Sequence, residues 1–230
     1  FIADTFETRP RAKAQPDVFE TVHNRRFLKV TLGGGGIGAP TRVWVKASCL
    51  AANRGGVILE RNPDAPGSDL MLASSATGAH IFLSSERCHV VLLRLGRPGH
   101  SPGPGSGNTE SLFVNMDSLL AFEPTVRHTV NQVPLHRPGG TIMATVKVAF
   151  LQGSGYVALL AQGPPMTVAV DPGLPPLCSN PLATIGWSSN VVFPHLTPKP
   201  GFLEAAAANT KKVNFSCPRP VSRIFVRVVR

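Results

Sequence analysis

The sequence has few of the residues that catalytic and metal sites most often need. Its 230 residues include 13 aspartates and glutamates against 23 lysines and arginines. The cysteines, Cys49, Cys88, Cys178 and Cys217, form no C-x-x-C pair, the spacing typical of zinc and redox sites. We therefore expect buried free thiols, and we predict neither a metal nor a cofactor.

Long helices and membrane spans are also missing from the expected fold. Glycine and proline each number 22, and both residues destabilise helix interiors. The longest stretch without charge, between Lys147 and Asp171, is interrupted by glycines and prolines, so we do not expect it to span a bilayer. Many short strands joined by turns explain this composition, and the predicted fold class is all-β.

Short apolar segments bounded by glycine, proline, asparagine or serine predict strands along most of the chain. Two short helices are also expected, one after a capping box formed by Asp17 and Glu20, and one over the alanine-rich residues 202–209. The expected strands are residues 27–32, 42–48, 56–61, 69–73, 79–84, 88–95, 111–115, 141–152, 155–161, 166–171 and 221–230.

Composition divides the chain into three parts. A basic arm covers residues 1–26, a repeated β-sandwich domain covers residues 27–200, and a short helix with a basic C-terminal tail covers residues 201–230. Within the domain, the segment 96–108 is rich in glycine and proline, and we expect it to form a surface loop.

An internal repeat underlies the expected domain. Residues 119–126 and 184–191 each join four mostly apolar residues, LLAF and TIGW, to a valine through a three-residue spacer. A weaker copy, residues 49–57, has one extra residue in the spacer. Three related β units are therefore predicted. An apolar strand precedes each copy, at residues 43–45, 112–114 and 167–170.

These motifs resemble a known family. The segments 111–115 (SLFVN), 120–122 (LAF), 153–163 (GSGYVALLAQG) and 168–171 (VAVD), with Gly186-Trp187, look like the altered-inheritance-of-mitochondria protein twenty-four family. That family is described as similar in fold to the tryptophan RNA-binding attenuation protein. The resemblance implies β-sandwich units about a pseudo-threefold axis and, for eukaryotic members, a mitochondrial location. It lends no defined chemistry.

The likeness runs from about residue 27 to about residue 192. The basic arm, the loop at 96–108 and the tail after Pro194 depart from the family pattern, and the net charge is high for the family. We expect a specialised function to lie in these departures.

The candidate catalytic motifs favour structural roles. Residues 33–38 fit G-x-G-x-x-G, but a nucleotide site needs a helix directly behind the glycines, and the β-rich run 42–46 follows instead. We expect a flexible hairpin connection there. Asp171 lies in a turn sequence, and Ser154 lies in a hairpin without G-x-S-x-G. The seven histidines show no metal-ligand spacing. A non-catalytic protein without a small-molecule substrate is predicted.

Positive charge is concentrated towards both ends of the sequence. The net charge is +10, and residues 211–230 contain six lysines and arginines with no acid. Cations placed on phosphates release counterions, and the arginine fork suits phosphate oxygens, so a polyanion such as RNA is the expected partner. Segment 221–230 predicts a strand with one cationic face. The residues predicted to bind nucleic acid are Arg9, Arg11, Lys13, Arg25, Arg26, Lys211, Lys212, Arg219, Arg223, Arg227 and Arg230.

Three functional hypotheses follow. The favoured one is a structural protein of a mitochondrial ribonucleoprotein in the matrix, namely a mitochondrial ribosomal protein, with the large subunit preferred. Its arm and tail would contact rRNA and its loops would contact neighbouring mitochondrial ribosomal proteins. The alternative is an organiser at the inner mitochondrial membrane that binds anionic lipid headgroups. The third, an enzyme with a small-molecule pocket, lacks every catalytic arrangement considered above.

Overall fold

The regular structure of this chain consists of β-strands. A computed structural model describes residues 18–33, 42–62, 68–86, 88–96, 111–136, 142–163, 165–170, 177–179, 183–189, 192–196, 213–216 and 222–227. Within these segments the strands are interrupted only by turns and by short 3-10 turns such as Ala47–Cys49. The all-β prediction is confirmed. The helix expected at 202–209 and the turn expected at Asp171 lie outside the described residues.

Each of the eleven predicted strands corresponds to an observed one, and three of them, β2, β7 and β13, have the predicted bounds. Eight further strands were not predicted. In chain order the observed strands are β1 (Phe19–Val22), β2 (Phe27–Leu32), β3 (Arg42–Lys46), β4 (Leu50–Arg54), β5 (Ile58–Arg61), β6 (Leu70–Ser74), β7 (Ala79–Ser84), β8 (His89–Leu95), β9 (Leu112–Asn115), β10 (Leu119–Phe122), β11 (Val126–His136), β12 (Ile142–Gly153), β13 (Gly155–Ala161), β14 (Pro165–Val170), β15 (Leu177–Ser179), β16 (Thr184–Ser188), β17 (Val192–Leu196), β18 (Val213–Ser216) and β19 (Ser222–Arg227).

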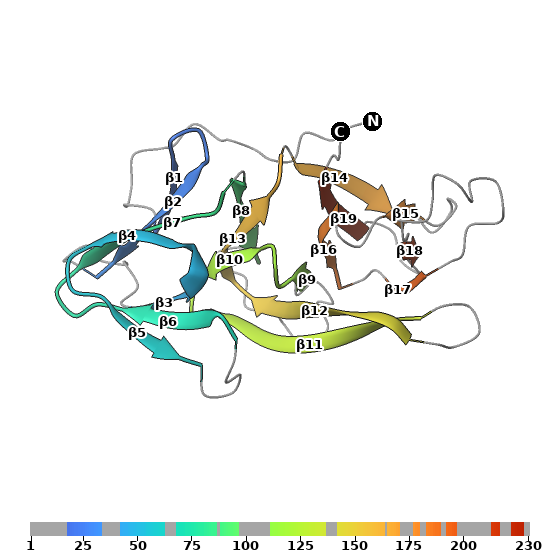
Figure 1. The fold of residues 1–230 in the computed structure, drawn as a ribbon, viewed down its shortest axis with the longest axis horizontal. Helices are drawn as coiled ribbons and strands as arrows, with labels where there is room; N and C mark the ends of the chain where they lie inside the picture. The colour runs from blue at the N-terminus through green and yellow to red at the C-terminus, as the bar shows by residue number, and fades with distance from the viewer. Residues whose placement is uncertain are drawn as a thin grey trace. The chain divides into compact units, whose positions relative to one another are not determined.

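The strands form four sheets (Figure 1). Sheet A has the order β1-β2-β7-β4, sheet B β5-β6-β3-β10-β13-β8, sheet C β11-β12-β9-β16-β19-β14, and sheet D β15-β18-β17. Sheets A and B make up one compact unit, and sheets C and D make up a second. The two units interleave along the sequence, because β10 and β13 complete a sheet that otherwise comes from the first half of the chain. The domain expected over 27–200 stays a prediction.

The strand order repeats every six strands. Adding six to each strand number in sheet B gives the order of sheet C. The first half of the sheet B order, β5-β6-β3, recurs in sheet D as β17-β18-β15. The second half, β10-β13-β8, recurs in sheet A as β4-β7-β2. The chain thus comprises three successive copies of one topology, β2–β7, β8–β13 and β14–β19, with β1 added. The arrangement of the copies about a pseudo-threefold axis remains a prediction.

Each copy contributes three strands to one sheet and three strands to another. We call β4-β7-β2 and its counterparts, β10-β13-β8 and β16-β19-β14, the first triads. We call β5-β6-β3 and its counterparts, β11-β12-β9 and β17-β18-β15, the second triads. Sheets B and C each join the second triad of one copy to the first triad of the next copy.

The structure shifts the weak repeat of the sequence by one residue. β4 pairs with β7 through an irregularity between Leu50 and Ala52, and β16 pairs with β19 through one between Thr184 and Gly186. When these bulges are aligned, Ala52 is equivalent to Gly186 in the repeat. In this alignment the spacer of the weak copy has three residues, as in the other two copies. The strand that corresponds to β3 and β9 in the third copy is β15, and not the expected segment 167–170.

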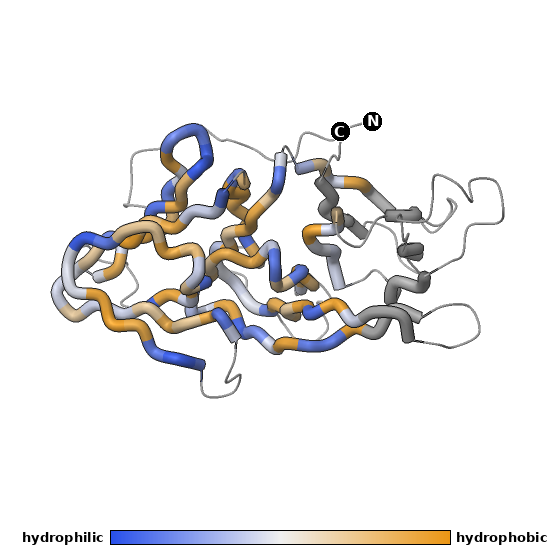
Figure 2. Tube along the Cα trace, viewed as in Figure 1, coloured by the Kyte–Doolittle hydropathy of each residue, from blue (hydrophilic) through white to orange (hydrophobic). Residues whose placement is uncertain are grey.

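Sheets A and B enclose a hydrophobic core, to which β2 and β7 contribute every second side chain. In β2, Leu28, Val30 and Leu32 are completely buried, while the residues between them are half-buried. Figure 2 shows the apolar stretches along these strands. Each such burial contributes about 1.5–3 kcal/mol to folding. The core cluster consists of Val18, Phe19, Leu28, Val30, Leu32, Val43, Val45, Cys49, Ala73, Ala79, Ile81, Leu83, Cys88, Val90, Leu120, Ala121, Ala158 and Leu160.

The prediction of a helix after the capping box Asp17-Glu20 is wrong. Residues Phe19–Val22 form β1, which pairs in register with β2. Phe19 is only 2% exposed, and its burial in the sandwich core outweighs the local helix signal. Glu20 accepts a hydrogen bond from Nζ of Lys29 across the strand pair at 3.1 Å, so it caps no helix. Residues 19–26, which we assigned to the basic arm, therefore form part of sheet A and its first turn.

Two expected hairpins are also wrong. The glycine segment 33–38 follows β2 of sheet A and precedes β3 of sheet B, so it connects two sheets. Its first residue, Gly33, has φ +57°, which glycine adopts readily. Ser154 likewise lies between β12 of sheet C and β13 of sheet B. Neither segment joins two paired strands, because β2 and β3 enter different sheets, and so do β12 and β13.

We predict that Gly155→Ala destabilises the protein by about 1–3 kcal/mol. Gly155 has φ +154°, and an added Cβ would lie 2.6 Å from Oε2 of Glu123 and 2.7 Å from Oγ1 of Thr125. Glu123 cannot move freely, because this oxygen accepts a hydrogen bond from the backbone N–H of Tyr156 at 2.9 Å. Thermal unfolding measures the effect. Gly56→Ala is the control, since its nearest neighbour would be 3.9 Å away; equal melting temperatures for both variants would contradict the prediction.

We predict that stability falls at alkaline pH through Cys49. Cys49 and Cys88 are buried free thiols, as expected, whereas Cys178 lies on β15 and Cys217 lies outside the described residues. Burial raises the pKa of Cys49 above its ordinary value of 9.0. The unfolded thiol then ionises before the folded one, so this contribution to stability is lost as pH rises above that value. The melting temperature of wild type should fall more steeply there than that of Cys49→Ala. Parallel curves would contradict the prediction.

Candidate nucleic-acid interface

The turn between β1 and β2 carries two of the predicted nucleic-acid-binding residues. His23, Asn24 and Arg25 have φ values of 50°, 55° and 63°, so three consecutive residues occupy the left-handed region. For arginine this conformation is uncommon, and a surrounding structure must hold it. The backbone N–H of Arg26 donates to the carbonyl of His23 at 3.1 Å, and the N–H of Val90 in β8 donates to the carbonyl of Arg25 at 2.7 Å. The turn is therefore fixed against sheet B.

Arg25 and Arg26 present their side chains to solvent on this fixed turn. Within the part of the chain that the structure describes, no carboxylate forms an ion pair with either guanidinium. Lys29, the third residue of β2, is different, because its Nζ lies 3.1 Å from Oε2 of Glu20. The turn is the polar loop at the end of the β1–β2 pair in Figure 2. Its two guanidinium groups are available for an external anion.

The strand predicted near the C-terminus is present as β19, an interior strand. β19 lies between β16 and β14 in sheet C, with Arg223 paired to Ala169 and Arg227 paired to Pro165. This part of the predicted tail is therefore folded into a sheet. The remaining predicted binding residues lie outside the described residues: Arg9, Arg11, Lys13, Lys211, Lys212, Arg219 and Arg230.

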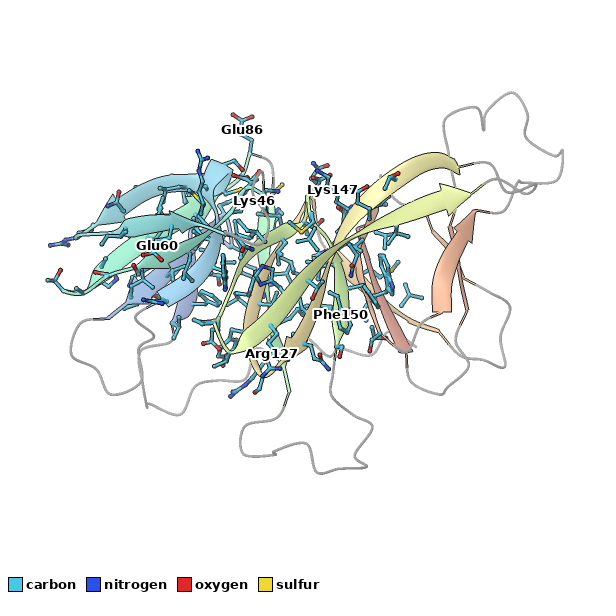
Figure 3. All side chains as sticks on the ribbon, turned by 90° about the horizontal axis from the view of Figure 1, so that it is seen from below. Lys46, Glu60, Glu86, Arg127, Lys147 and Phe150 are labelled. Atoms are coloured by element: carbon cyan, nitrogen blue, oxygen red, sulfur yellow. The ribbon has the colours of Figure 1, made fainter. Side chains whose placement is uncertain are left out.

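The strands also carry exposed cations that the sequence analysis did not select. In sheet C, Arg127 of β11 and Lys147 of β12 are exposed and extend away from the ribbon (Figure 3). Arg94 of β8 is exposed, and its guanidinium lies over the Tyr156 ring, 5.1 Å from the centroid. The alternation of charged and apolar residues along each strand could have identified these cations as exposed from the sequence. Sheets A and B add further exposed cations at Arg42, Arg54 and Arg61.

Two acidic side chains, Asp69 and Glu123, form structural contacts. Asp69 accepts hydrogen bonds from the backbone N–H of Ser48 at 3.1 Å and from the Ser48 hydroxyl. Glu123 accepts the N–H of Tyr156, as described above. Among the described residues, no group of three or more histidine, cysteine, aspartate or glutamate side chains is arranged to hold a metal ion. The described segments likewise contain no helix with the length and hydrophobicity required to cross a bilayer.

Comparison with known proteins supports the fold. No family model matches this sequence, and no curated protein matches it. The crystal structure of protein SPYM3_0169 from Streptococcus pyogenes is similar, with a TM-score of 0.64 and 15% sequence identity. The similarity covers 92% of this chain and 93% of that protein. At this identity the likeness concerns the fold alone, and it extends over nearly the whole of both chains.

Proposed function

We propose that this protein is a non-catalytic structural component of a mitochondrial ribonucleoprotein, and specifically a mitochondrial ribosomal protein that contacts rRNA phosphates. The observation that carries the proposal is the Arg25-Arg26 pair, exposed on a turn that hydrogen bonds hold in place. The pair belongs to a chain of net charge +10, so a polyanion is the partner that electrostatics favours.

The fixed turn supports phosphate contact more strongly than a free arm would. A guanidinium on an ordered backbone loses less conformational freedom on binding than one on a disordered segment. The planar guanidinium groups of two adjacent arginines can also donate paired hydrogen bonds to neighbouring phosphate oxygens. The turn therefore suits recognition of a nucleic-acid backbone, in which phosphates recur at regular spacing.

The mitochondrial assignment is supported by the resemblance to the altered-inheritance-of-mitochondria protein twenty-four family. In this proposal the β-sheets form a scaffold in the matrix, and cations on the turn, on β19 and on the terminal segments contact rRNA. The loops contact neighbouring mitochondrial ribosomal proteins. The large subunit is the preferred location.

We predict that the endogenous protein sediments with a ribosomal subunit from mitochondrial lysate, because phosphate contacts hold it in the particle. Digestion with ribonuclease before the gradient should move it to light fractions. Sedimentation with membranes that ribonuclease does not change would contradict the proposal and favour binding to anionic lipid. A light species in both gradients would contradict a stable place in the ribosome.

We predict that Arg25→Gln combined with Arg26→Gln weakens RNA binding and reduces its salt dependence. The slope of log K against log salt is negative, and each lost phosphate contact reduces its magnitude by about 0.7–0.9, so the loss of two contacts reduces it by about 1.5. Fluorescence anisotropy with a labelled structured RNA at several salt concentrations measures the slope.

The matched control is Arg42→Gln combined with Arg61→Gln, which removes the same charge from exposed positions outside the turn. This variant should lower affinity through net charge and leave the slope closer to that of wild type. An unchanged slope in the turn variant, or equal slopes in the two variants, would remove the turn from the interface.

A further inference from the structure

We propose that the outer face of sheet A binds a terminal phosphate group, as in inorganic phosphate or a phosphomonoester. The site is formed by Thr31, His80 and Arg54, which lie on three neighbouring strands, β2, β7 and β4. It includes neither arginine of the Arg25-Arg26 turn, and the proposal does not depend on RNA binding there.

The strand register places the three side chains in one row. Thr31 lies opposite His80 in the β2–β7 pair, and Arg54 lies opposite His80 in the β4–β7 pair. Residues directly opposite each other point to the same side of a sheet, with Cβ atoms about 4.5–5.5 Å apart. The next residues along β2 and β7, Leu32 and Ile81, are completely buried. The row therefore faces away from the core.

The histidine ring is held in place by its neighbour on β2. Oγ1 of Thr31 lies 3.4 Å from Nδ1 of His80. When the hydroxyl donates to Nδ1, the ring proton is on Nε2, which is then the donor that an anion can use. Thr31 is thus a positioning residue, and His80 is the group that contacts the phosphate.

Arg54 supplies the positive charge of the site. It is exposed, and no carboxylate among the described residues forms an ion pair with it. Glu20 is the only acidic residue in the four strands of sheet A, and it pairs with Lys29. The guanidinium of Arg54 is therefore available, and its planar fork suits two oxygens of one phosphate.

Glycines leave space beside the row. Two positions beyond it, towards the same end of sheet A, each of the three segments has a glycine: Gly33, Gly78 and Gly56. A Cβ at Gly33 would lie 3.4 Å from the backbone nitrogen of Gly78, so these two segments run close together there. Residues without a Cβ let a ligand approach the backbone closely. The glycine end therefore leaves the row open to an anion.

A buried hydroxyl at the same end lacks a partner. Ser75, in the connection from β6 to β7, is 4% exposed, and its Oγ has no hydrogen-bond partner in the described part of the chain. A Cβ at Gly33 would lie 3.3 Å from the carbonyl oxygen of Ser75, so Ser75 borders the glycine end. A buried hydroxyl without a partner is unfavourable. A phosphate bound at this end would bring oxygen atoms that accept such hydrogen bonds.

The arrangement favours a terminal phosphate over a phosphate within a nucleic-acid backbone. A terminal phosphate carries about −1.5 to −2 charges at neutral pH and presents three acceptor oxygens. Nε2 of His80 and the guanidinium of Arg54 approach from neighbouring strands, whose spacing is about 4.8 Å. Donors from two strands can therefore engage different oxygens of one group.

Equilibrium dialysis of the full chain against radiolabelled inorganic phosphate, at constant ionic strength, tests the proposal. Wild type should show saturable binding at one site. Arg54→Gln should raise the dissociation constant by about tenfold or more, because it removes charge-assisted hydrogen bonds. Since Arg54 is exposed, this variant should have the melting temperature of wild type.

Arg61→Gln is the matched control, because it removes the same charge from an exposed position on β5, the outer strand of sheet B. It should bind phosphate like wild type. Absence of saturable binding by wild type would overturn the proposal, as would equal weakening by the two variants.

Two variants test the positioning role of Thr31. Thr31→Val removes the hydroxyl and should weaken phosphate binding about fivefold. Thr31→Ser keeps the hydroxyl and should bind like wild type. Equal affinities for the two variants would show that the hydroxyl does not orient His80.

Competition distinguishes the two kinds of phosphate. Uridine 5′-monophosphate should displace the labelled phosphate, whereas the dinucleotide UpU, whose single phosphate is a diester, should displace much less at the same concentration. Equal displacement by the two compounds would overturn the assignment to a terminal phosphate, because the site would then accept the nucleic-acid backbone.

Discussion

The pairing of a second triad with a first triad is the interaction on which the structure depends. These junctions are the pairs β3–β10 and β9–β16. At each one a small residue, Ala121 or Gly186, allows close approach of the strands, and an aromatic pair stacks beside it. The constraint is steric as much as hydrophobic: Gly186 has no space for a Cβ. A repeat protein of this type gains stability from neighbouring copies, because each of the two six-stranded sheets combines strands of two copies. The junctions therefore determine which strands are interior and which are left at an edge.

The same architecture positions the cationic turn. Its three left-handed residues are held by a hydrogen bond from β8, and β8 begins the second copy of the topology. The hydrogen bond between β8 of the second copy and the β1–β2 turn of the first copy therefore holds this turn in one conformation. Arg25 and Arg26 are exposed on a turn that strand pairing and the hydrogen bond from Val90 position. Charge alone attracts a polyanion, whereas charge on a fixed backbone can discriminate its geometry.

The sequence predicts local features well where one pattern dominates. The bounds of 27–32 and 79–84 are correct because alternation and flanking turn residues agree there. Phe19 shows where local signals fail, since its burial in a core built from distant strands overrides the capping pattern. The repeat was misaligned by one residue because a bulge changes the pairing without changing composition. The sequence identifies Arg25 and Arg26 as candidate binding residues. It does not predict their left-handed conformation, because that conformation is held by a hydrogen bond from β8, which is distant in sequence.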